Sequence, residues 1–178
     1  VTGDNGIGLL GAHKTEMTNN KDIIIGDNGI GILGLNKLTP TSQEDGFKIT
    51  QAANATIKYA GNGKSAFGVV ALNNDGTSTT YTSDVTLGAN SQIDFSNTVG
   101  GIGVLLRGTK INFTDNGSII KVGKKGRGIF IEDNSTSAAN AFTLALNGGK
   151  IEASGDGAIG VYSNKALSTA KAVDVQGK

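Results

Sequence analysis

The chain has 178 residues, a formal net charge of +1, 28 glycines, one proline, and neither cysteine nor tryptophan. The near balance of charge gives no reason to expect a nucleic acid or another polyanion as partner. The lack of cysteine excludes a disulfide scaffold, and no run of about 18 apolar residues is present that could form a membrane-spanning helix.

The sequence begins at Val1 and opens without the pattern of a signal peptide. We therefore expect a mature or excised segment of a longer exported protein. We also expect residues 1–178 to form a single unit without a second domain.

A glycine-rich apolar block recurs along the chain. Gly-Asp-Asn-Gly-Ile-Gly-Leu-Leu-Gly occupies residues 3–11, and a nearly identical block occupies residues 26–34. Degenerate copies follow at 66–70, 101–105, 126–130 and 158–162. The central glycines of these blocks are spaced 23, 37, 35, 25 and 32 residues apart. An internal repeat of this length indicates a solenoid.

Short runs of alternating apolar and polar residues lie between the blocks, for example at 85–87, 93–95, 111–113 and 151–153. They are rich in β-branched and aromatic residues and are bounded by Gly, Asn, Asp and Ser, which is typical of strands and turns. Neither a leucine-rich frame nor a long helical period is present. One period thus predicts three strands and three turns, which is one coil of an all-β parallel β-helix. Residues 83–108, 109–133 and 140–164 are three such coils, out of about six in the chain.

The glycines are interpreted as turn residues, because glycine adopts positive φ at tight corners without steric cost. The Gly or Ala that precedes the central glycine is expected to leave room where coils stack closely. Asp4, Asp27 and Asp156 are expected to hydrogen-bond the backbone of their own turns.

Several short motifs resemble cofactor-binding or metal-binding sequences, but the residues around them do not fit such a site. Residues 6–11 and 29–34 match the dinucleotide fingerprint, but neither is followed by a convincing helix. The segment 63–65 resembles the end of a phosphate-binding loop, but the first glycine of that loop would fall on Lys58. The calcium-binding β-roll repeat does not occur, and His13, the single histidine, has no cysteine to share a zinc ion with. We therefore expect no cofactor and no metal.

Catalysis is the serious alternative to a binding role, because some β-helix proteins are carbohydrate-active enzymes that carry acids on one outer sheet. Alignment of the predicted strands stacks Lys58, Asp94, Lys121 and Glu152 in one row. Alternating charges on adjacent strands stabilise a sheet modestly and oppose register slips. We interpret this row as structural, and we expect no enzyme.

Extra residues follow the glycine-rich strand in most periods, at 12–22, 36–46, 73–83, 133–141 and 163–172, whereas the turn at 107–110 is tight. Additions at the same corner of successive coils project from one edge of a solenoid, which we call the insertion edge. Function concentrates on loops held by a rigid scaffold. The candidate binding residues of the insertion edge are Glu44, Asp45, Asp75, Tyr81, Glu132 and Asp133. The alternative is that the inserted segments are tolerated surface elaborations without a binding role. Lys121, Lys124, Lys125 and Arg127 form a basic cluster that fits a solvated turn or an acidic partner.

The repeated Asn-Gly-Ile-Gly-Ile-Leu and Gly-Ala-Ile-Gly-Val-Tyr-Ser, set among strands rich in Thr and Asn, resemble the passenger domains of large monomeric autotransporter adhesins of Gram-negative bacteria. The resemblance covers essentially the whole chain but rests on the style of the repeats. It implies a right-handed parallel β-helix, held at the outer membrane by a separate C-terminal domain that is not in this sequence. It also implies attachment to a host-cell receptor, a glycan or another bacterial surface. A non-binding stalk and a carbohydrate-active enzyme remain the alternatives.

Overall fold

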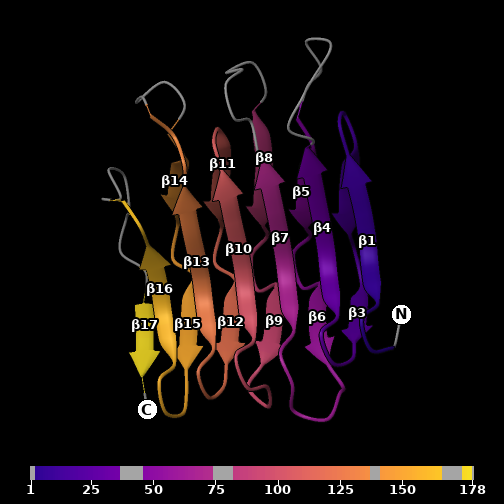
Figure 1. Cartoon of the computed structure of the whole chain (residues 1–178), viewed down its shortest axis with the longest axis vertical. Helices are drawn as coiled ribbons and strands as arrows, with labels where there is room; N and C mark the ends of the chain where they lie inside the picture. Colours follow the sequence, from indigo (N-terminus) through magenta and orange to yellow (C-terminus); the bar gives the residue numbers. More distant parts are fainter. Residues whose placement is uncertain (1–2, 37–45, 74–81, 137–140, 166–173, 178) are drawn as a thin grey trace.

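The computed structural model describes residues 3–36, 46–73, 82–136, 141–165 and 174–177, and these residues contain strands and turns but no helix. No described helix is therefore available to cross a membrane. The strands form three parallel sheets, and the chain visits the sheets in turn before it returns to the first (Figure 1). This is the arrangement of a parallel β-helix, and it confirms the all-β, repeat-based prediction.

Sheet A contains the glycine-rich strands, in the order β1 (Ile7–Ala12), β4 (Ile30–Asn36), β7 (Phe67–Asn73), β10 (Ile102–Gly108), β13 (Arg127–Asp133) and β16 (Ile159–Ser163). Sheet B contains β2 (Glu16–Asn19), β5 (Lys48–Gln51), β8 (Ser83–Leu87), β11 (Ile111–Asp115) and β14 (Thr143–Leu146). Sheet C contains β3 (Asp22–Ile25), β6 (Thr56–Tyr59), β9 (Gln92–Phe95), β12 (Ile119–Val122), β15 (Lys150–Ala153) and β17 (Asp174–Gly177). Each coil is one pass through the three sheets, and the three strands predicted for each of 83–108, 109–133 and 140–164 are confirmed.

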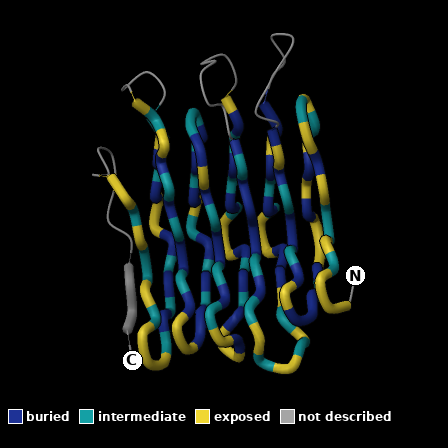
Figure 2. Tube along the Cα trace, viewed as in Figure 1, coloured by how far each residue is buried: buried dark blue, intermediate teal, exposed yellow. Residues whose placement is uncertain are grey.

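The core is a set of stacked apolar rows that point inward from the sheets. In sheet C, for example, Ile23, Ile57, Ile93, Ile120 and Ile151 are paired in register on neighbouring strands and are all buried. Sheets A and B supply matching rows, and burial is concentrated inside the coils, with exposed residues at the corners (Figure 2). Because each coil covers the apolar rows of the next, short strands of four to seven residues are sufficient to build a continuous core.

The central glycines are selected by close approach and not by backbone conformation. A Cβ atom added to Gly31, Gly68 or Gly103 would lie 2.4–2.7 Å from the carbonyl oxygen of the equivalent glycine in the next coil. The same Cβ would lie 2.5–2.8 Å from an isoleucine Cγ2 in sheet C. The glycine two positions earlier is also tightly packed, but mainly against its own turn: a Cβ added to Gly29, Gly101 or Gly126 would lie 2.9, 2.2 or 2.8 Å from its nearest neighbour in Ile25, Thr98 or Val122. The close contact between coils that the sequence placed there is made by the central glycine.

Asparagine shares the strained corners with glycine. Asn54 and Asn90 have φ of 61° and 56° at equivalent turns between sheets B and C, and Asn28 has φ of 54° at the corner between sheets C and A. Gly63 and Gly100, with φ of 89° and 75°, lie at this second corner in the following coils. Asparagine tolerates the left-handed region better than most residues because its short side chain can bond locally. The expectation of glycine at positive-φ corners is thus confirmed for part of the glycines only.

One of the predicted insertions is wrong. Residues 12–22 are not an added loop, because they contain the whole of β2, which pairs with β5 in register from Glu16↔Lys48 to Asn19↔Gln51. The tight turn at 107–110 is confirmed, since β10 ends at Gly108 and β11 begins at Ile111. The other long intervals follow the sheet A strands β4, β7, β13 and β16, and most of their residues lie outside the described ranges.

Candidate functional site

The residues predicted to bind at the insertion edge fall into two groups. Glu44, Asp45, Asp75 and Tyr81 lie outside the described residues. Glu132 lies within β13, and Asp133 is the last residue of that strand. Only these two can be assigned contacts.

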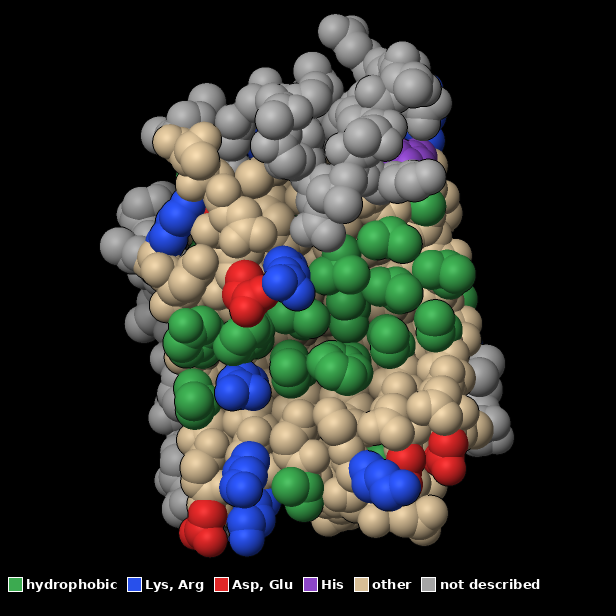
Figure 3. All heavy atoms as spheres, in the orientation of Figure 1, with side chains coloured by type: hydrophobic (Ala, Val, Ile, Leu, Met, Phe, Trp, Pro, Cys, Tyr) green, Lys and Arg blue, Asp and Glu red, His purple; other side chains and the backbone are tan. Residues whose placement is uncertain are grey.

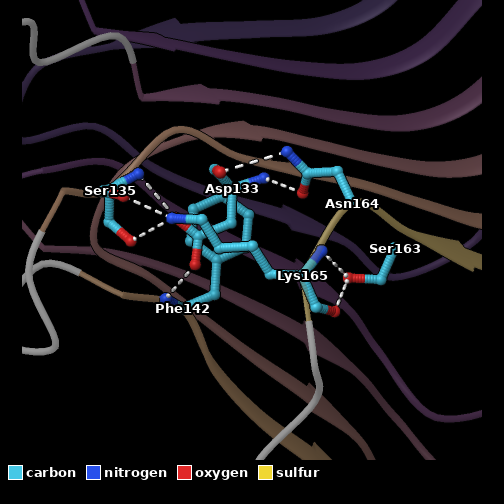
Figure 4. A network of polar contacts seen from close by, with 6 residues as sticks. All are labelled: Asp133, Ser135, Phe142, Ser163, Asn164 and Lys165. Carbon is cyan, nitrogen blue, oxygen red and sulfur yellow. Dashed lines mark hydrogen bonds and ion pairs between the residues drawn. The ribbon is translucent and has the colours of Figure 1, made fainter.

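Asp133 organises the corner between sheets A and B on two successive coils (Figure 4). Its carboxylate accepts hydrogen bonds from the Ser135 amide at 2.8 Å and the Phe142 amide at 3.2 Å, and pairs with the Lys165 ammonium at 3.3 Å. Its own amide donates to the Asn164 side chain of the next coil at 2.9 Å. Burial alone would raise the pKa of Asp133, but these hydrogen bonds outweigh it and lower the pKa. The Asp133 side chain is only 8% exposed, so its oxygens serve the corner.

Glu132 also contacts a neighbouring coil, through an ion pair. Its carboxylate lies 2.9 Å from Nε of Arg107, the residue opposite it on β10. Both side chains are partly exposed and stand on the outer side of sheet A. Such an exposed pair contributes at most about 1 kcal/mol to stability, and it leaves the two charges locally balanced.

The outer side of sheet A is largely apolar on all six strands. The side chains that point outward form a row in register on six consecutive strands, which consists of Leu10, Leu33, Val70, Leu105, Phe130 and Tyr162. A parallel row consists of Ile7, Ile30, Phe67, Ile102, Arg127 and Ile159. Leu35 and Leu72 add a short third row on β4 and β7, which Arg107 and Glu132 continue on β10 and β13. We call these residues, without Arg107, Arg127 and Glu132, the apolar face; Figure 3 shows it as a band of hydrophobic side chains.

This apolar face is accessible to a partner. Leu10 is 62% exposed and Tyr162 is 41% exposed, and most of the other members are partly exposed. Phe130 and Tyr162 stack with their ring centroids 4.7 Å apart, and the Arg127 guanidinium lies 5.0 Å from the centre of the Phe130 ring. Six strands span five spacings of about 4.8 Å, or about 24 Å, and the face is up to six residues, or about 20 Å, wide, which gives up to about 500 Å². A patch of this size is comparable to the largest that a typical monomer carries, and such patches are often functional.

The outer sides of the other two sheets are polar. Sheet B carries a threonine row, Thr18, Thr50, Thr86 and Thr114, beside a second row that is largely charged or polar. A shallow groove of about 610 Å³ crosses these rows and is lined by residues such as Lys48, Asp84 and Asn112. The described lining contains neither an aromatic ring nor a buried charged side chain, so this groove resembles ordinary solvated sheet surface.

Sheet C confirms the predicted register of alternating charges. Lys58 is paired with Asp94, Asp94 with Lys121, and Lys121 with Glu152. The Lys121 ammonium lies 3.9 Å from the Glu152 carboxylate, and Asp94 accepts bonds from the Ser96 amide and hydroxyl. The two acids are separated by a lysine strand, which is a charge ladder and not an acid–base pair. Within the described ranges, no group of three or more His, Asp or Glu side chains is placed to hold a metal ion.

The corner between sheets C and A depends on Asp27, which is buried. Its carboxylate accepts hydrogen bonds from the Tyr59 hydroxyl and from the amides of Asn62 and Lys64, the amides at 2.9 and 3.3 Å. The bond from Tyr59, together with those amides, lowers the pKa of Asp27 in spite of its burial. Asp4 accepts from the Asp27 amide at 2.9 Å. The prediction that Asp4 and Asp27 bond their own turns is wrong, because each bonds the following coil.

Comparison with family models, with curated proteins and with solved structures gave no match. The functional argument therefore rests on the surfaces of this chain alone. Sequence reasoning missed the apolar face, although its signal was present: the glycine-rich strands are apolar at consecutive positions, where a strand with one solvated side would alternate.

Proposed function

We propose that this chain is an adhesive segment of a bacterial surface protein, in which a rigid β-helix presents a preformed contact surface to a partner. The proposal retains the sequence-based expectation of an autotransporter passenger, with a right-handed helix of about six coils displayed outside the cell. It assigns no catalysis and no cofactor.

The observation that carries this proposal is the continuous apolar face of sheet A. Exposed Leu10 contributes little to the stability of a monomer, and Tyr162 contributes through its stacking on Phe130, whereas a binding partner would bury both side chains further. The scaffold beneath is fixed by parallel pairing on every strand and by the glycine contacts between coils. Because the face is held rigid before contact, little conformational entropy is lost on binding.

The corner residues support the proposal in a different way from that expected. Asp133 and Glu132 fix the joint between coils, so the described part of the insertion edge acts as support. The residues 37–45 and 74–81 keep their sequence-based role as candidate contact segments. Binding by the loops and binding by sheet A are separable by mutation, because they occupy different parts of the coil.

The test is attachment of the purified, fluorescently labelled chain to candidate host and bacterial cells. We compare the unmodified chain with Leu33→Lys and Leu105→Lys, and with a form in which 37–45 and 74–81 are replaced by short Gly-Asn turns. This form keeps Asn36, Asn73 and Ser83, which are buried and linked by hydrogen bonds of 2.8 and 3.1 Å. Thr86→Lys is the matched control, because it adds the same charge on the outer side of sheet B.

Saturable attachment that is lost in the sheet A variants and kept in Thr86→Lys supports the proposal as stated. Loss only in the loop-shortened form would move the contact to the insertion edge and would refute the role of sheet A. If the unmodified chain attaches to none of the cells, the stalk alternative replaces the adhesive one.

A further inference from the structure

We propose that the apolar face of sheet A binds the same face of a second copy of this chain, so that two β-helices pack sheet against sheet. This inference rests on the proposed adhesive function and names its partner. It follows from three properties of the face, which are its shape, its charge and its area.

The shape of the face fits another β-sheet better than a helix or an irregular surface. The strands of sheet A run side by side and nearly parallel (Figure 1), and their outward rows repeat at every coil. Two sheets pack face to face at about 10 Å when both present side chains on a regular pleat. A second copy offers the same repeat, and a two-fold contact places the patch against itself.

The charge of the face favours a neutral partner. Its ionised neighbours are Arg107, Glu132 and Arg127, and the first two neutralise each other at 2.9 Å. The Arg127 guanidinium lies against the Phe130 ring. Recognition of anionic lipid or of an acidic protein would require a cluster of unpaired basic residues. A second copy brings the same almost balanced charge, and Arg107 of one copy can exchange carboxylates with its counterpart.

The area of the face predicts a weak contact. Two faces of up to about 500 Å² bury up to about 1,000 Å² in total, which is at the lower limit for a specific interface. We therefore expect weak, reversible association that requires a high protein concentration. Because the contact is apolar, ammonium sulfate should strengthen it, whereas an electrostatic contact would weaken as salt is added.

Sedimentation velocity of the purified 178-residue chain, from about 10 μM to 1 mM, tests this inference directly. We expect a monomer–dimer equilibrium that shifts toward dimer in sulfate. Leu105→Lys, at the middle of the outward row between Val70 and Phe130, should weaken dimerisation at least about tenfold, because it buries an unpaired charge. Leu33→Lys should do the same from another strand, and Thr86→Lys should leave the dimer unchanged. Circular dichroism and the thermal midpoint of each variant show whether it is folded.

The outcomes separate this inference from the proposed function. A chain that stays monomeric at 1 mM overturns the self-association, and so does a dimer that survives both lysine variants. If the chain is monomeric but its attachment to cells still requires Leu105, the adhesive function stands with a different partner. A dimer lost in both sheet A variants and kept in Thr86→Lys supports the inference, whatever the cells show.

Discussion

The substitution Gly68→Ala is expected to destabilise the fold strongly, although it adds only one methyl group. Its Cβ would lie 2.4 Å from the carbonyl oxygen of Gly103 and 2.7 Å from Cγ2 of Ile93. A separation of at least 3.0 Å is needed, so the Gly103 carbonyl would have to move by about 0.6 Å, which is 3.0 minus 2.4. That group belongs to β10, which is paired with strands on both sides. Overpacking of a rigid site costs about 1–3 kcal/mol, and two simultaneous contacts place this case near 3 kcal/mol.

Urea unfolding followed by circular dichroism measures this cost. With a denaturant slope of about 2 kcal/mol per molar, a loss of about 3 kcal/mol lowers the midpoint by about 1.5 M. Gly100→Asn is the matched control, because Gly100 has φ of 75° but no atom within 4 Å of an added Cβ. This control should cost no more than about 1 kcal/mol, since asparagine tolerates such a backbone. A loss below 1 kcal/mol in Gly68→Ala would refute the close-approach argument.

Three further changes test other parts of the structure. The pKa of Asp27 and of Asp133 is lowered in the folded state, so the unfolded chain binds protons more readily. The free energy of unfolding should therefore fall as the pH drops below about 4. In urea unfolding measured at several pH values, Asp27→Asn should make this decrease smaller. Asn73→Ala should lower the free energy of unfolding by about 1–3 kcal/mol. The reason is that the buried Asn73 side-chain amide donates to the Thr109 carbonyl at 2.7 Å and accepts from the Asn36 side chain at 2.8 Å. Thermal unfolding measures this decrease. Lys121→Glu places a third carboxylate between Asp94 and Glu152 and should cost about 1 kcal/mol, an effect that 1 M salt should largely remove; an unchanged loss at high salt would contradict the charge-ladder interpretation.

The sequence allowed the sheet C register to be predicted residue by residue. The reason is that its strands carry an isoleucine at the inward position and a charged residue at the next, as in Ile93-Asp94 and Ile120-Lys121. A slip of one residue would exchange the two sides of the strand, so the pattern admits one register. The stacking of the central glycines was predictable for the same reason, because the block recurs with few changes.

Two features were beyond the same reasoning. Strand β2 has the sequence Glu-Met-Thr-Asn, which is too short and too weakly apolar to be recognised; it is held in place by pairing with β5 and by the burial of Met17. The outward position of Leu33 and Leu105 was hidden because both neighbours along the strand are also apolar or glycine. Periodicity cannot distinguish the two sides of such a strand.

The corner carboxylates show a third limit. Asp27 was expected to bond within its turn, as an isolated turn residue would. In the β-helix, the nearest unsatisfied amides belong to the following coil, about 4.8 Å away. The partner is therefore determined by stacking, which a single stretch of sequence does not reveal. Asp133 combines both cases: Ser135 and Phe142 belong to its own corner, whereas Lys165, 32 residues away, comes from the following coil.

The unequal outer sides of the three sheets give the molecule one apolar side, which extends across the strands in the direction in which the coils stack. Under the proposed function, contact is made along this side of the coil stack and not at its ends. Each additional coil with the same residue pattern would extend the apolar face by one strand, and no separate binding pocket would be needed. Under the proposed function, adhesive strength should therefore depend on the number of coils: duplication of one repeat should increase it, and deletion of one repeat should decrease it.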